Sequence, residues 1–91
     1  MKVIYRTHAV HRMFQRSISP ETVKKVLDKG EIIENYPEDL PYPSRLMLAW
    51  DGARPVHVVA AENKAEDETI VITAYEPDAR QWENDFKRRK K

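Results

Sequence analysis

The stretch RLMLAWDGARPVHVVAAE, residues 45–62, has one apolar run on each side of Asp51-Gly52. Asp-Gly favours the tight turns whose twist matches that of two paired strands. Apolar side chains fall on both sides of the first run: Leu46, Leu48 and Trp50 on one side, Met47 and Ala49 on the other. We therefore expect a β-hairpin inside a sheet, with one face packed on helices.

Further strands are expected on both sides of this hairpin. The run TIVITAYE, residues 69–76, is rich in β-branched side chains, and Pro77 ends it. EIIENY, residues 31–36, predicts another strand, whereas KVIY, residues 2–5, is an edge strand or a lead-in that packs on the core.

Two short helices are expected before the strands. Thr7 is a candidate N-cap for a helix over residues 8–16. Apolar residues at helical spacing form the expected core face of this helix: Ala9, Val10, Met13 and Phe14. Ser19 and Pro20 predict the start of a second helix. Lys29 and Gly30 predict its end, since the glycine is able to take the left-handed conformation.

The order of these elements predicts an α+β fold. Two N-terminal helices would pack on one face of an antiparallel sheet of about four strands. Residues 78–86 would form a short C-terminal helix or a packed tail, anchored by Trp82 and Phe86. The second sheet face is then either covered by this tail or left as a concave binding surface. Because no repeat or linker interrupts the chain, we expect one domain over residues 1–91, with residues 87–91 as a frayed basic tail.

The charge is unevenly distributed along the chain. The net charge is +1, but residues 1–30 carry seven Lys/Arg against two acids and residues 31–86 carry four against thirteen; the last five residues, KRRKK, are all basic. Such asymmetry is found in proteins that bind polyanions, and equally in solvated surfaces with a basic tail. The chain has no cysteine, which excludes disulfides and thiolate metal sites. With no signal peptide or membrane-spanning run expected, we predict a cytoplasmic protein without a membrane partner.

A basic stripe is expected on the polar side of the first helix. His8, Arg12 and Arg16 follow one another at a spacing of four residues, and His11 and Gln15 flank them without any acid. Arginine and histidine could bind a phosphate and move protons near neutral pH. The simpler interpretation is a solvated helix face, or arginines paired with distant acids of the same chain.

Three further side chains are candidates for a site. His57 lies in the middle of a strand and could transfer protons if its face is open. Tyr75 ends the last strand, and Arg45 could complete a basic rim or pair with Asp39. His8 and His11 lack a third ligand at metal-binding spacing, so no metal is expected.

The sequence also resembles a known family. HAVHRMFQRSISPETVKKVLDKGEIIENYP, PYPSRLMLAW, VHVVAAE and TIVITAYEPDARQW are similar to a family of small bacterial domains of unknown function, often encoded beside YgiT-type zinc-finger antitoxins. That family is in turn similar to the BrnT and RelE-like toxins, which place helices on an antiparallel sheet, cleave RNA and are neutralised by an antitoxin. The resemblance marks His8, Arg12, Arg16, Arg45 and Tyr75 as site residues. The acidic middle of this chain departs from the strongly basic toxins.

The resulting hypothesis is a metal-independent, cofactor-free endoribonuclease acting on RNA, free or as ribosome-bound mRNA, with a cognate antitoxin as partner. Arg12, Arg16 and Arg45 would hold the phosphate, with His11 as a further substrate-binding residue. His8 or His57 would act as acid or base together with Tyr75. One alternative is a non-catalytic module of the same fold that binds nucleic acid or protein. Another is a purely structural stripe.

Overall fold

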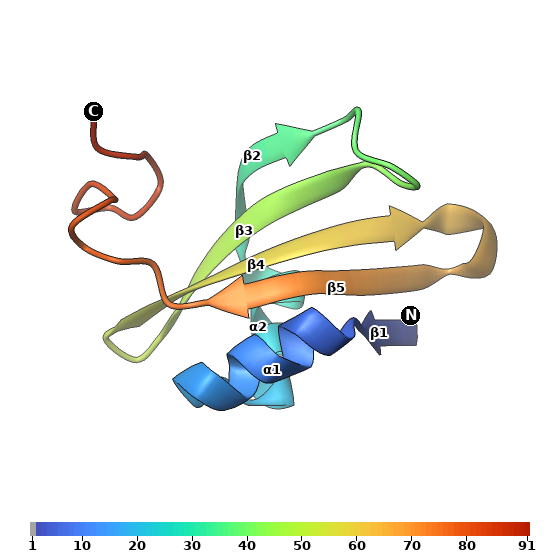
Figure 1. Cartoon of the computed structure of the whole chain (residues 1–91), viewed down its shortest axis with the longest axis horizontal. Helices are drawn as coiled ribbons and strands as arrows, with labels where there is room; N and C mark the ends of the chain where they lie inside the picture. The colour runs from blue at the N-terminus through green and yellow to red at the C-terminus, as the bar shows by residue number, and fades with distance from the viewer. Residues whose placement is uncertain (1) are drawn as a thin grey trace.

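A five-stranded mixed sheet, covered by two helices on one face, forms the centre of the computed structural model, which describes residues 2–91 (Figure 1). The strands are β1 (Lys2–Tyr5), β2 (Glu31–Tyr36), β3 (Ser44–Asp51), β4 (Arg54–Asn63) and β5 (Glu68–Tyr75), in the order β1-β5-β4-β3-β2. The α+β class is confirmed. The expectation of about four antiparallel strands is wrong, because β1 adds a fifth strand that runs parallel to β5.

The hairpin expected at the centre is formed by β3 and β4. Their register places Asp51 opposite Arg54, so the two loop residues are Gly52 and Ala53, one position later than the Asp51-Gly52 pair suggests. Gly52 has a φ of +63°, whereas Ala53 has an ordinary negative φ, as in a type II′ turn. This register puts His57 opposite Leu48 and, across the next strand pair, opposite Tyr75.

Helices α1 (Thr7–Arg16) and α2 (Pro20–Lys29) connect β1 to β2. The start of α2 is confirmed, since the Ser19 side chain accepts a hydrogen bond from the backbone N–H of Thr22. Thr7 is not the N-cap of α1: that position is Arg6, and no side chain caps the helix there.

The glycine at the end of α2 has another role than expected. Gly30 is extended, with φ −71° and ψ 162°, and is not left-handed. A Cβ at this position would lie 2.4 Å from the carbonyl oxygen of Val26 and 3.0 Å from that of Leu48. Glycine is therefore needed because two backbones approach closely. The left-handed residue is Ser17, which ends α1 with a φ of 53°.

The main hydrophobic core lies between the helices and the sheet, with α1 against β5 and α2 against β3 and β4. Its buried members are Ala9, Met13, Ile18, Val23, Val26, Met47, Val56, Val58, Ala60, Val71 and Ala74. Two expected members are absent: Phe14 is 83% exposed and Val10 is 37% exposed. Helix α1 is rotated so that Ala9, Met13 and part of Arg12 face inward, since Arg12 is half-buried with its Nε shielded from solvent.

The opposite face of the sheet is covered by the C-terminal segment, residues 76–91, which contains no helix. Trp82 is buried and forms an isolated β-bridge with Arg89, and the ring of Phe86 meets Trp50 edge-on at 5.7 Å between centroids. The backbone N–H of Lys90 donates to Gln81 at 2.8 Å. Residues 76–90 therefore form a packed tail over this face and not a helix. Across residues 2–91, no helix combines the length and apolarity needed to span a membrane.

Candidate functional site

A polar cleft of about 330 Å³ lies where α1, the end of β5 and the C-terminal segment meet. Helix α1 contributes Arg12 and Arg16, and β5 and the residue after it contribute Tyr75 and Glu76. The C-terminal segment supplies the remaining lining residues: Asp78, Gln81, Trp82 and Arg89. The basic side of α1 thus faces a hollow next to the sheet.

Tyr75 and His57 form a hydrogen-bonded pair at this cleft. They lie opposite each other on β5 and β4, and the Tyr75 hydroxyl is 3.2 Å from Nδ1 of His57. The other ring nitrogen, Nε2, is 2.8 Å from the backbone carbonyl oxygen of Phe86. Because a carbonyl only accepts, Nε2 of His57 carries a hydrogen, and in the neutral ring Nδ1 accepts from the Tyr75 hydroxyl.

His57 lies behind Tyr75 rather than in the cleft itself. Its exposed fraction is 0%, and the Trp82 ring meets it edge-on at 4.5 Å between centroids. Burial lowers the pKa of His57, although the hydrogen bond to Phe86 partly offsets this effect. The imidazole is therefore neutral at pH 7 and can accept a proton only through Tyr75.

The charges of two arginines affect the pKa of Tyr75. Burial raises the pKa of Tyr75, while the positive charges of Arg89 and Arg12 lower it. Arg89 also stacks on Trp82, with the guanidinium carbon 4.8 Å from the ring centroid. Arg12 makes no ion pair within residues 2–91, and its buried Nε has no hydrogen-bond partner. The cleft thus holds positive charge beside a proton-bearing hydroxyl.

The acids of the cleft are partly neutralised from outside it. Arg80 donates to both carboxylate oxygens of Asp78, at 2.9–3.2 Å. These hydrogen bonds are the main reason that the pKa of Asp78 is lowered, and the charge of Arg16 adds to the effect. Neither Arg12 nor Arg16 is bridged to a carboxylate in the described part of the chain, so the structural interpretation of the stripe lacks the ion pairs it requires.

The structure therefore brings together Arg12, Arg16 and Tyr75 in one cleft, with His57 directly behind. His8 and His11 are exposed on α1 and do not line the cleft. Arg45 pairs with Glu62 at 3.2 Å, not with Asp39, and lines a separate hollow with Asn35 and Lys64.

Arg89 is not among the residues predicted from the sequence, because the basic run KRRKK favours a frayed tail. The chain folds back between Trp82 and Arg89, with the N–H of Glu83 donating to the carbonyl of Arg88 at 2.8 Å. The turn-favouring pair Asn84-Asp85 is a signal that could have indicated this reversal. Within residues 2–91, no group of three or more His, Cys, Asp or Glu side chains is placed to hold a metal ion.

Comparison with known proteins places the chain in one family. A family model described as "Domain of unknown function (DUF4258)" matches residues 5–76, which include α1, β4 and Tyr75 but not Trp82 or Arg89. No curated protein and no solved structure matches the chain. Since the match spans most of the sequence, this chain belongs to the DUF4258 family of domains of unknown function.

Proposed function

We propose that this chain is a toxin-type endoribonuclease that cleaves RNA by attack of a 2′-hydroxyl on the adjacent phosphate. The observation that carries this proposal is the cleft itself. Arg12 and Arg89 flank a tyrosine hydroxyl, and that hydroxyl is hydrogen-bonded to a buried neutral histidine.

In the proposed reaction, the guanidinium groups of Arg12 and Arg89 hold the non-bridging oxygens of the scissile phosphate and stabilise its growing charge. The Tyr75 oxygen takes the proton of the 2′-hydroxyl while its own proton passes to Nδ1 of His57. The 2′-oxygen bonds to phosphorus, and the bond to the 5′-oxygen breaks. Water protonates the departing 5′-oxygen. The hydroxide left behind takes the proton from the Tyr75 oxygen, and Tyr75 recovers its own proton from Nδ1 of the buried His57. Side chains and water account for every proton, so the scheme needs no metal or cofactor.

The resemblance to YgiT-associated domains and to BrnT and RelE-like toxins supports this proposal and adds a RelE-like fold and a neutralising antitoxin to it. We therefore propose a bacterial toxin–antitoxin role in the cytoplasm, with RNA or ribosome-bound mRNA as substrate. Growth arrest on expression in a bacterial host, absent for Tyr75→Phe, is the expected cellular result.

A second candidate is a module that binds RNA in the same cleft without cleaving it. The complete burial of His57 under Trp82 favours this reading, because the pair could then serve only to hold Tyr75 in place. Glu76 and Asp78 in the cleft would weaken phosphate binding in either case.

The test uses neighbouring arginines as matched variants. Purified wild-type protein, Arg12→Ala, Arg89→Ala and Arg88→Ala are incubated with end-labelled RNA in a chelator, with and without translating ribosomes. We expect products ending in 2′,3′-cyclic phosphate, slowed roughly tenfold or more by loss of Arg12 or Arg89, since each makes a charged phosphate contact.

Arg88 is the control because it carries the same charge one residue away but is 78% exposed, pairs with Asp85 and does not line the cleft. Its loss should leave the rate within about twofold. Binding without cleavage would establish the second candidate. Cleavage that requires a metal ion, or equal rates for all four proteins, would contradict the proposed mechanism.

A further inference from the structure

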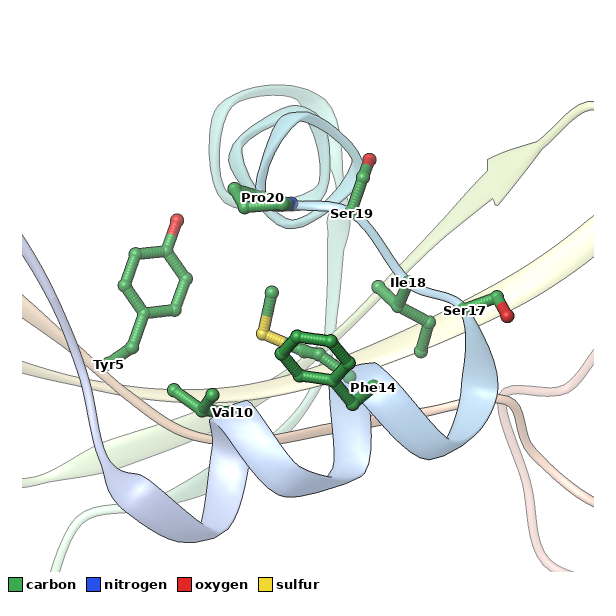
Figure 2. A pocket seen from close by; sticks show the side chains of 8 residues that line it. Tyr5, Val10, Phe14, Ser17, Ile18, Ser19 and Pro20 are labelled. Atoms are coloured by element: carbon green, nitrogen blue, oxygen red, sulfur yellow. The ribbon is translucent and has the colours of Figure 1, made fainter.

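A second hollow, on the other side of α1, is apolar. It has a volume of about 550 Å³ and lies between α1 and the start of α2, with Tyr5 of β1 at one end (Figure 2). We call it the α1–α2 groove; its lining residues are Tyr5, Val10, Met13, Phe14, Ser17, Ile18, Ser19 and Pro20. Met13 and Ile18 are 7% and 4% exposed and form its floor, while Phe14 is 83% exposed.

Part of the apolar lining of the groove is not buried by the rest of the protein. Of the apolar arc of α1, only Ala9 and Met13 are buried by the sheet, which leaves Val10 and Phe14 beside the hollow. Figure 2 shows the Phe14 ring lying over α1 between Val10 and Ile18. The Tyr5 hydroxyl, at the end of the groove, is shielded from solvent and has no hydrogen-bond partner. An occupant that covers the Phe14 ring would remove this exposed apolar area from water.

Two exposed cations lie beside lining residues of the groove. Arg6 directly follows Tyr5, and Lys24 lies one helical turn after Pro20. Arg6 and Lys24 are exposed and make no ion pair within residues 2–91. One acid, Glu21, lies next to Pro20, and its charge adds to the burial that raises the pKa of Tyr5, so the two cations outnumber it beside the groove. The complementary occupant is therefore apolar on one side and acidic on the other.

The same charges argue against two other occupants. A second copy docked groove to groove would bring two strongly basic N-terminal regions together, which costs free energy through like-charge repulsion. An anionic bilayer would be attracted by the charge, but a flat surface cannot reach Met13 and Ile18 at the floor of a groove.

We propose that the α1–α2 groove is the docking site of an acidic amphipathic segment of a partner protein. The segment lies between the helices as a helix in a groove, with apolar anchors against Phe14, Met13 and Ile18 and Asp or Glu towards Arg6 and Lys24. Docking here is independent of the proposed nuclease chemistry, because none of the groove residues lines the polar cleft.

The test is a selection of displayed random peptides, each long enough for about four helical turns. The full-length wild-type chain is the target, and Phe14→Asp and Leu40→Asp are compared with it. Leu40 is a matched control because it is 91% exposed and does not line the groove, so this variant adds the same charge at an equally exposed apolar position. Circular dichroism checks that both variants are folded.

We expect peptides enriched on the wild type to carry apolar residues three or four apart with acids between them. They should bind Leu40→Asp equally well and Phe14→Asp at least about tenfold more weakly. No enrichment, basic peptides, or equal binding to Phe14→Asp would overturn the proposal. It would also be overturned by a wild-type dimer that Phe14→Asp dissociates, or by Phe14-dependent binding to vesicles of anionic lipid.

Discussion

The two faces of strand β4 show two ways of burying a sheet. Val56, Val58 and Ala60 point towards the helices and are fully buried in an apolar core. Between them, His57 points to the opposite face and is equally buried, but both of its ring nitrogens are hydrogen-bonded, to Tyr75 and to Phe86. The helix face thus depends on packed volume. The other face adds to its packed Leu46, Leu48 and Trp82 a buried polar group whose partners are satisfied, because an unpaired buried donor or acceptor is costly.

The difference also explains the place of the candidate site. A face closed by two helices leaves no room for a substrate beside the strands. The opposite face is closed by a segment without regular helix or long strand, and an open polar cleft remains at its border with α1.

The largest effect is expected on the helix face. Met47→Ala removes a side chain that is 4% exposed in the core, and it should lower the free energy of unfolding by about 2–5 kcal/mol. Urea denaturation measures this loss, with Leu40→Ala as an exposed control that should change little. A loss below about 0.5 kcal/mol for Met47→Ala would mean that volume does not determine the stability of this face.

On the other face, His57→Leu introduces an apolar side chain of similar bulk. It leaves the Tyr75 hydroxyl and the Phe86 carbonyl without their partner. The free energy of unfolding should fall by about 1–3 kcal/mol. His8→Leu, at an exposed position, is the matched control. A more stable His57→Leu protein would show that packing alone governs both faces.

The next largest effect is expected in the pH dependence of the free energy of unfolding, to which His57 on the second face should contribute. Burial lowers the pKa of His57 in the folded state, so the unfolded chain binds more protons between that lowered value and about 6.5. The free energy of unfolding should therefore fall as the pH is lowered through this window, and the fall should disappear in His57→Gln. A double variant, His8→Gln with His11→Gln, should keep it. Identical slopes for His57→Gln and the wild type would rule out His57 as the source.

The smallest effect is expected for Phe14→Ser. With 83% of its side chain exposed, Phe14 contributes little to the fold, and the free energy of unfolding should change by less than about 0.5 kcal/mol. Met13→Ser, one residue earlier and buried, should cost several times more. Comparable losses in thermal or urea denaturation would show that α1 packs through its whole apolar arc.

Several features that depend on neighbours in sequence could be predicted, but the N-cap of α1 and the conformation of Gly30 were not among them. The β3–β4 hairpin follows from Asp51-Gly52 and the apolar runs, and the start of α2 follows from Ser19 and Pro20. Arg12, Arg16, His57 and Tyr75 were identified by their residue types and by family resemblance, and they do lie together.

Features that depend on distant pairings could not be predicted. The parallel pairing of β1 with β5 joins the first and the last strand along the chain, and no local signal encodes it. The register that places His57 opposite Tyr75 includes a bulge between Val59 and Ala60, and a shift of one residue would have reversed the faces. Arg89 entered the cleft only because the chain folds back onto Trp82.

The central claim is that the Tyr75 hydroxyl, backed by His57, moves the proton in RNA cleavage. Its most direct test is single-turnover cleavage by Tyr75→Phe, with RNA affinity measured in parallel. We predict a rate lower than wild type by roughly 100-fold or more, with affinity nearly unchanged, because the variant loses acid–base chemistry but keeps Arg12 and Arg89. Cleavage by Tyr75→Phe at the wild-type rate, or no cleavage by the wild type under any condition, would contradict the claim.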